Sequence, residues 1–239
     1  DDSKLLIDEN HKEFYKSLGI KTELPLDGVN DFTFESINNC EEKVFDKVEA
    51  EAQFYTMGGM QNALVAWNKL YHRSLFLLDS EEAIFYPVGK IFEDGFTTYR
   101  LIYESEKIAF INAPLYYYRQ RGGSIMKENA NVNFNHAIDA GIERLDFYKS
   151  KNEEELFKLE LNYTIYSPIR FYEIMDKRKI LSKEDKASLR NYYKIIYNNY
   201  FKKSKWPLAK RIRIGSFGIS YNLYKLISAF EKTYNNIKK

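Results

Sequence analysis

The sequence predicts a mixed α/β fold to about residue 125, followed by a helical region. Short apolar runs bounded by glycine, proline or polar residues, which are typical of buried strands, mark the first part. From about Asn131 onward, apolar residues recur at the three- and four-residue spacing of a helix face. We therefore expect two regions, 1–128 and 129–239, which are either two layers of one domain or two domains.

The first region is expected to alternate strands and helices. Phe32–Phe34 and Ala63–Trp67 have the composition of short strands, and the second of these is expected to be buried. Ser74–Phe76 is predicted to form a brief helical turn and Tyr86–Lys90 a loop.

A helix is predicted to begin at Glu93 and Asp94, because apolar residues then follow at helical spacing and acids favour the positive end of a helix. Lys107–Ile111 is predicted to be the next strand, and Leu115–Tyr118 continues in an extended conformation after Pro114.

The second region is predicted to be a succession of helices. Ile138, Ile142 and Leu145 form the stripe of the first. The remaining boundaries rest on start and stop signals. These signals are Asn152 with Glu155 as a capping box, Pro168 as a break, Ser182 with Asp185 as a third start, Pro207 as a first helical position, and a last helix beginning near Ser220.

Composition and charge restrict the class of protein. The 239 residues are 44% hydrophobic and 29% charged, which excludes a disordered tail. The single cysteine, Cys40, suits a reducing compartment, and the three histidines show no metal-ligand spacing. No apolar stretch approaches the roughly 20 residues that span a bilayer, and no signal peptide opens the chain. We therefore predict a cytoplasmic protein.

The net charge of +2 hides an asymmetry between the two ends of the chain. Residues 201–239 carry ten basic residues and one acid, or 10 − 1 = +9, whereas residues 1–200 carry 26 basic and 33 acidic residues, or −7. The acidic body argues against a nucleic-acid binder. The basic tail predicts peripheral contact with an anionic surface, such as the inner face of the cell membrane.

Seven tail residues are the candidates for that contact, as an interfacial tryptophan and the cations around it: Trp206, Lys202, Lys203, Lys205, Lys210, Arg211 and Arg213. The last helix adds an apolar face that includes Leu223, Leu226, Phe230 and Tyr234. The alternative is a C-terminal helix that packs on the domain and keeps its lysines in water. The residues alone leave both interpretations open, because every surface helix is amphipathic.

Three further groups of residues could carry chemistry, and each has a structural alternative. Glu93 and Asp94 could supply a carboxylate base or could only cap a helix. Trp67, Asn68 and Lys69 could stack and hydrogen-bond a sugar, or the tryptophan could belong to the core. The third group could clamp a diphosphate or form a solvated turn, and it consists of Arg119, Arg121 and Ser124 beside Gly122-Gly123.

Three blocks together strongly resemble the back half of bacterial family 2 glycosyltransferases: Ala66–Phe76, Tyr86–Asp94 and Pro114–Met126. They occur in this order and at about this spacing in that family, and the resemblance covers roughly residues 60–130. It implies the back half of a GT-A-like sheet with flanking helices. It also implies inverting transfer of a sugar from a nucleotide-sugar donor to a glycan or lipid-linked acceptor, in capsule, exopolysaccharide or cell-wall glycan synthesis.

The resemblance also assigns roles to residues. Asp94 falls at the position of the catalytic base, with Glu93 beside it. Trp67, Asn68 and Lys69 fall on the acceptor-side strand. The substrate-binding loop that closes over the donor diphosphate in the family corresponds here to Arg119, Arg121 and Ser124.

The chain departs from the family at its beginning. We find no nucleotide-binding βαβ unit and no Asp-x-Asp metal motif, so we expect the donor-binding half to lie upstream of Asp1. The divalent metal of the family, Mg²⁺ or Mn²⁺, would then be bound mainly by that half and not by this chain, which alone would be inactive. The alternative function is a non-catalytic module that docks on a membrane or a partner through the basic tail.

Overall fold

The computed structural model of the protein describes residues 42–56, 63–76, 83–111 and 134–237. Within these residues the chain is mostly helical and contains one two-stranded antiparallel sheet. The chain forms two compact units. The described residues of the first unit are 42–45 and 107–111, and the other described residues belong to the second.

The sheet of the first unit pairs β1 (Glu42–Phe45) with β2 (Ile108–Ile111). Glu42 lies opposite Ile111 and Phe45 opposite Ile108, and the rings of Phe45 and Phe110 lie 6.4 Å apart. The strand predicted at Lys107–Ile111 is therefore confirmed. The half-sheet of a GT-A fold does not appear in the part of the chain that the structure describes, so the mixed α/β prediction holds only for this small sheet.

The strand predicted at Ala63–Trp67 is wrong. These residues form consecutive turns and bends, of which Leu64 is buried. The segment then reaches Asn68, which has a φ of 61°, a left-handed conformation that no strand accommodates. A short apolar run predicts burial but not the backbone conformation. The helical turn at Arg73–Phe76 and the loop at Tyr86–Lys90 are confirmed.

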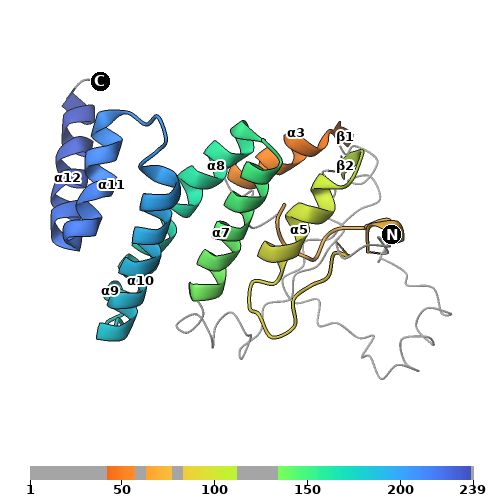
Figure 1. The fold of residues 1–239 in the computed structure, drawn as a ribbon. Coiled ribbons are helices and arrows are strands. Elements are labelled where there is room, and N and C mark those ends of the chain that lie inside the picture. The colour runs from red at the N-terminus through yellow and green to blue at the C-terminus, as the bar shows by residue number, and fades with distance from the viewer. Residues whose placement is uncertain (1–41, 57–62, 77–82, 112–133, 238–239) are drawn as a thin grey trace, which may run out of the picture. The chain divides into compact units, whose positions relative to one another are not determined.

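Four helices pack together in the first part of the second unit (Figure 1). They are α3 (Lys47–Ala52), α5 (Asp94–Tyr103), α7 (Phe134–Ser150) and α8 (Glu154–Thr164). Helix α3 contacts α5 and α8, while α7 lies between α5 and α8. The predicted face of α5 is buried, as are Ile138 and Leu145 of α7.

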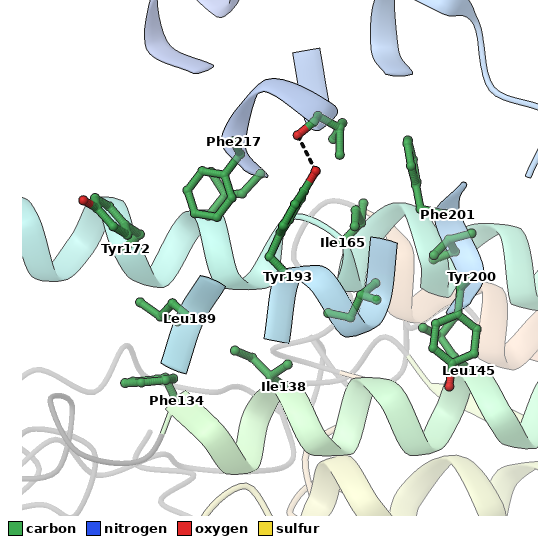
Figure 2. Close-up of a cluster of buried hydrophobic side chains, with 14 of the residues drawn as sticks. Phe134, Ile138, Leu145, Ile165, Tyr172, Leu189, Tyr193, Tyr200, Phe201 and Phe217 are labelled. Carbon is green, nitrogen blue, oxygen red and sulfur yellow. Dashed lines mark hydrogen bonds between the residues drawn. The ribbon is translucent and has the colours of Figure 1, made fainter. Parts of the chain in front are cut away.

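The second part of this unit continues with α9 (Ser167–Lys177), α10 (Lys183–Ile196), a π-helical turn at Tyr197–Phe201, α11 (Leu208–Ile219) and α12 (Tyr221–Ile237). The core that these helices form with α7 and α8 combines isoleucine and leucine side chains with six buried aromatic residues (Figure 2). Tyr193 lies at its centre and donates a hydrogen bond of 2.8 Å to the Ile214 carbonyl, which ties α10 to α11 (Figure 2). No described helix combines the length and apolar character needed to span a membrane.

The predicted helix boundaries are mostly confirmed. Ser182 and Asp185 form a capping box, and Pro168 stands in the first turn of α9, directly after the break from α8. Asn152 is the exception, because it ends α7 and does not start α8. Its φ of 59° and the hydrogen bond from Glu153 N–H to the Tyr148 carbonyl are those of a left-handed helix stop.

Helices α7 and α8 approach each other closely at Gly141. A Cβ atom built there would lie 2.5 Å from Thr164 Oγ1, so we expect Gly141→Ala to lower the free energy of unfolding by about 1–3 kcal/mol. Gly215 of α11 provides the matched control, because its nearest neighbour, the Tyr197 hydroxyl, is 3.5 Å away. Gly215→Ala should leave stability unchanged or raise it by up to about 1 kcal/mol through helix propensity. Urea denaturation of both variants measures the difference, and equal effects would contradict the close packing.

Candidate functional site

The candidate site forms where the 63–69 segment meets the N-terminus of α5. Asp94 is the first residue of α5, and its Oδ1 atom accepts a hydrogen bond of 2.8 Å from Gly95 N–H. A second backbone hydrogen bond comes from Ala66 of the 63–69 segment. The 63–69 segment and the start of α5 therefore meet at the Asp94 carboxyl group.

Burial and charge set the protonation of this site. Burial raises the pKa of Asp94 above its usual value, and the neighbouring Glu93 carboxylate raises it further, whereas the two backbone hydrogen bonds and Arg144 act in the opposite direction. Burial lowers the pKa of Lys69 to about 8, and attraction to Asp94 partly offsets this effect. The site thus holds a carboxyl group with a proton affinity above that of an exposed aspartate, next to a cation.

The loop that carries Lys69 is held in place by hydrogen bonds. Lys69 Nζ donates to the Val65 carbonyl and to Asn68 Oδ1, both at 2.8 Å. Lys69 is half-buried and Asn68 is exposed. Trp67 is half-buried and does not belong to the buried core. This position favours a binding role over a core role for Trp67, and the binding role stays a prediction.

Helix capping does not account for Glu93. Glu93 is the N-cap residue of α5, but its side chain makes no capping hydrogen bond within the described structure. By contrast, Asp46 and Ser182 cap α3 and α10 with complete capping boxes. Side-chain capping therefore does not explain Glu93, whereas Asp94 in the first turn of α5 does accept a hydrogen bond from a backbone N–H of the helix start.

Two residues with a positive φ belong to the segments that form the candidate site. Among the described non-glycine residues, four have a positive φ, and two of them, Asn152 and Lys179, follow helix ends, where this conformation is usual. The other two are Asn68 with a φ of 61° and Phe92 with a φ of 64°. A bulky residue in this region costs roughly 1–3 kcal/mol and tends to occur at functional sites. Both lie within two residues of candidate site residues.

Sequence reasoning missed three polar groups at this site. Tyr71 lies close enough to Tyr86, Thr98 and Asp94 for all three to affect its pKa, which burial raises above its usual range. However, the Tyr71 and Thr98 hydroxyl groups are buried without a hydrogen-bond partner of good geometry in the described chain. Unpaired buried hydroxyls are uncommon and indicate a place where a ligand or water completes the hydrogen bonding. Tyr71 and Tyr86 belong to the blocks Ala66–Phe76 and Tyr86–Asp94, but a tyrosine in such a block does not by itself indicate a binding site.

A buried ion pair supports the helix that carries Asp94. Arg144 of α7 contacts Glu160 of α8 through Nε at 2.8 Å and Nη2 at 3.2 Å, and its Nη1 donates to the Gly95 carbonyl at 2.7 Å. Glu160 also accepts hydrogen bonds from Tyr55, at 2.5 Å, and from Thr164. An arginine within an apolar helix stripe is the signal by which the sequence could have revealed this group.

The remaining predicted binding residues, Arg119, Arg121 and Ser124, lie outside the described residues. The described part of the chain contains no group of three or more His, Cys, Asp or Glu residues arranged to hold a metal ion. The roles of all candidate site residues stay predictions.

The basic tail is partly packed. Trp206 stacks on Phe201 with ring centroids 6.0 Å apart, and Lys210 Nζ lies 3.3 Å from the centre of the tryptophan ring. Burial lowers the pKa of Lys210 to about 8, with a smaller contribution from Arg213. Arg213 pairs with Glu231 at 2.8 Å and donates to the Tyr166 hydroxyl. The other four predicted tail cations, Lys202, Lys203, Lys205 and Arg211, are exposed.

Comparison with known proteins shows a distant, partial similarity to a glycosyltransferase. It is similar to part of the glycosyltransferase GlyA of Streptococcus pneumoniae, with 32% identity over 127 residues. This alignment covers 52% of the chain and 17% of GlyA, so the chain spans less than a fifth of that relative. No protein-family model matches the sequence, and no solved structure matches it. The chain is thus a distant partial relative of a bacterial glycosyltransferase.

Proposed function

We propose that this chain is the acceptor-side part of an inverting family 2 glycosyltransferase. The single observation that carries the proposal is the half-buried Asp94 carboxyl group, whose pKa is raised and which meets the Trp67–Lys69 segment. The partial similarity to GlyA supports the reaction class. The donor would be a nucleotide-sugar and the acceptor a glycan or a lipid-linked saccharide.

In this mechanism Asp94 is the general base. Its carboxylate accepts the proton of an acceptor hydroxyl, and the acceptor oxygen forms a bond to the anomeric carbon of the donor sugar. The bond from that carbon to the diphosphate oxygen breaks on the opposite face, and the nucleoside diphosphate leaves with the electron pair. Backbone hydrogen bonds from Gly95 and Ala66 hold the carboxylate in position.

Neighbouring side chains would complete the acceptor site. Tyr71 places a further polar side chain near Asp94, and Trp67 offers an aromatic face to a sugar ring. The divalent metal of such enzymes, which neutralises charge on the leaving diphosphate, would be bound by residues other than those the structure describes.

We expect Asp94→Asn to lower the rate of sugar transfer about 10²- to 10⁴-fold, because an amide does not accept the proton. The substitution is made in the full-length protein that contains this chain. Release of nucleoside diphosphate is measured with UDP-glucose, UDP-galactose and UDP-N-acetylglucosamine, with extracted lipid-linked saccharides as acceptors. Asp176→Asn, at an exposed carboxylate of α9, is the matched control. Unchanged transfer by the Asp94 variant would refute the assignment.

A further inference from the structure

The last two helices, α11 and α12, form an antiparallel hairpin joined at Ser220 (Figure 1). Its inner side is fixed by aromatic contacts. Phe217 of α11 meets Tyr193 of α10 with ring centroids 5.1 Å apart, and Tyr221 of α12 meets Tyr172 of α9 at 4.5 Å. The pair of Arg213 and Glu231 joins the two helices to each other at 2.8 Å.

The opposite side of the hairpin is apolar and exposed. Leu226, Phe230 and Tyr234 follow one another at four-residue intervals, so they form one row on α12, about 12 Å long. Helical spacing places this row away from Tyr221, and it places the exposed apolar residues of α11 away from Phe217 in the same way. The outer apolar face therefore comprises Leu208, Ile212, Ile219, Leu226, Phe230 and Tyr234, each 50–75% exposed.

Positive charge lies at one end and along one edge of the outer apolar face. Lys202, Lys203 and Lys205 directly precede the first turn of α11, and all three are exposed. Arg211 of α11 is an exposed cation beside the row of Leu208 and Ile212. The exposed Lys225 and Lys232 of α12 lie on the side of Tyr221, and Lys225 Nζ is 4.6 Å from the centre of the Tyr221 ring. The single acid of residues 201–239, Glu231, is paired with Arg213. The hairpin thus combines a cluster of large apolar side chains with uncompensated cations.

We propose that the outer apolar face docks on an anionic lipid surface. The apolar side chains would enter the boundary between headgroups and acyl chains, while the lysines and arginine remain at the level of the acidic headgroups. A second copy of the chain fits less well, because two such faces would bring like charges together. The inference does not rest on the proposed sugar transfer, since binding to lipid needs neither donor nor acceptor.

The structure changes which residues make this contact. Trp206, the interfacial aromatic residue predicted from sequence, is packed between Phe201 and Lys210. Phe230 and Leu226, on the outer apolar face, take its place as the apolar anchors. The exposed tail cations keep the electrostatic part of the predicted role.

Co-sedimentation with vesicles tests the proposal on the 239-residue chain. We expect binding to vesicles of equal parts phosphatidylglycerol and phosphatidylcholine, and at least tenfold weaker binding to phosphatidylcholine alone. Leu226→Ser with Phe230→Ser should weaken binding about tenfold or more. Ile174→Ser with Ile180→Ser, at exposed apolar positions outside the hairpin, is the matched control and should bind like the wild type.

A charge variant gives a second, independent measurement. Lys202→Glu, Lys203→Glu and Lys205→Glu together should weaken binding roughly a hundredfold, and added salt should weaken binding of the wild type. This variant decides the question if the Ser variant fails to fold by circular dichroism. The proposal is overturned if the wild type does not bind the acidic vesicles. It is also overturned if the Ser variant and the charge variant both bind as tightly as the wild type. A dimer that the Ser variant abolishes would also overturn it, because a second copy would then cover the face.

Discussion

Arg144→Met is expected to lower the free energy of unfolding by about 3–5 kcal/mol. Arg144 is 3% exposed and Glu160 is fully buried, so removal of the guanidinium leaves a buried carboxylate without its cation. The hydroxyl groups of Tyr55 and Thr164 remain as donors to Glu160, but they carry no charge to compensate it. The Gly95 carbonyl also loses its donor, so the first turn of α5 loses a tie to α7.

A double variant separates the lost ion pair from the lost packing. Arg144→Met with Glu160→Gln removes both charges. Tyr55 and Thr164 donate to different oxygens of Glu160, so the glutamine carbonyl can accept from one of these hydroxyls while the amide NH2 donates to the other. We expect this double variant to recover at least half of the loss, because replacing a whole buried pair costs less than breaking it. Urea denaturation of both single variants and the double variant measures the coupling. A loss below about 1 kcal/mol for Arg144→Met alone would show that the pair is not a buried ion pair in solution.

The stability of the protein is expected to fall as the pH rises from about 5 to about 8, because of Glu51. Glu51 of α3 is fully buried, and neither carboxylate oxygen has a hydrogen-bond partner in the described structure. Burial raises the pKa of Glu51 from 4.5 to about 8, with smaller increases from the Glu153 and Glu160 charges, while Tyr148 and Arg144 lower it.

The sign follows from the two protonation states. The folded chain keeps the proton on Glu51 until the pH approaches about 8, whereas the unfolded chain releases it near pH 4.5. Above pH 4.5 the unfolded state thus binds fewer protons and gains stability relative to the folded state. This stabilising contribution is full below pH 4.5 and is lost as the pH rises toward 8, with a slope of up to about 1.4 kcal/mol per pH unit.

Glu51→Gln removes this dependence, because its amide stays neutral at every pH. We expect the variant to be more stable than the wild type at about pH 8 and to lose the slope between about pH 5 and 8. Thermal and urea unfolding across this range measure the effect. Glu106→Gln, at an exposed carboxylate, is the control and should keep the slope. Parallel wild-type and Glu51→Gln curves would contradict the buried, protonated glutamate.

Glu51 and Arg144 belong to the same buried surroundings as the candidate base. Arg144 touches Gly95 directly and lowers the pKa of Asp94, and it also lowers the pKa of Glu51. Substitutions of Glu51 or Arg144 are therefore expected to affect Asp94 through the first turn of α5. For this reason, any test of activity needs a measurement of stability beside it.

Local features of the candidate site were predictable from sequence, but their assembly was not. The helix start at Glu93 and Asp94 followed from the spacing of Phe96 and Tyr99. The conformation of the 63–69 segment did not, because Asn68 adopts its left-handed backbone only where the surrounding structure holds it. Likewise, no local signal pairs Arg144 with Glu160 or brings Tyr71 to Asp94, since these contacts join distant parts of the chain.

The sequence by itself determined the helical second region, most of its starts and breaks, the acidic pair at the head of a helix and the positive charge of the tail. These features depend on the order of neighbouring residues, on helical periodicity and on capping chemistry. Only the tertiary structure decided that β1 pairs with β2, that Trp206 packs on Phe201 and that Phe230 faces outward. The physical reason is that an amphipathic pattern shows which side chains are apolar, whereas packing against other helices decides which of these side chains are buried.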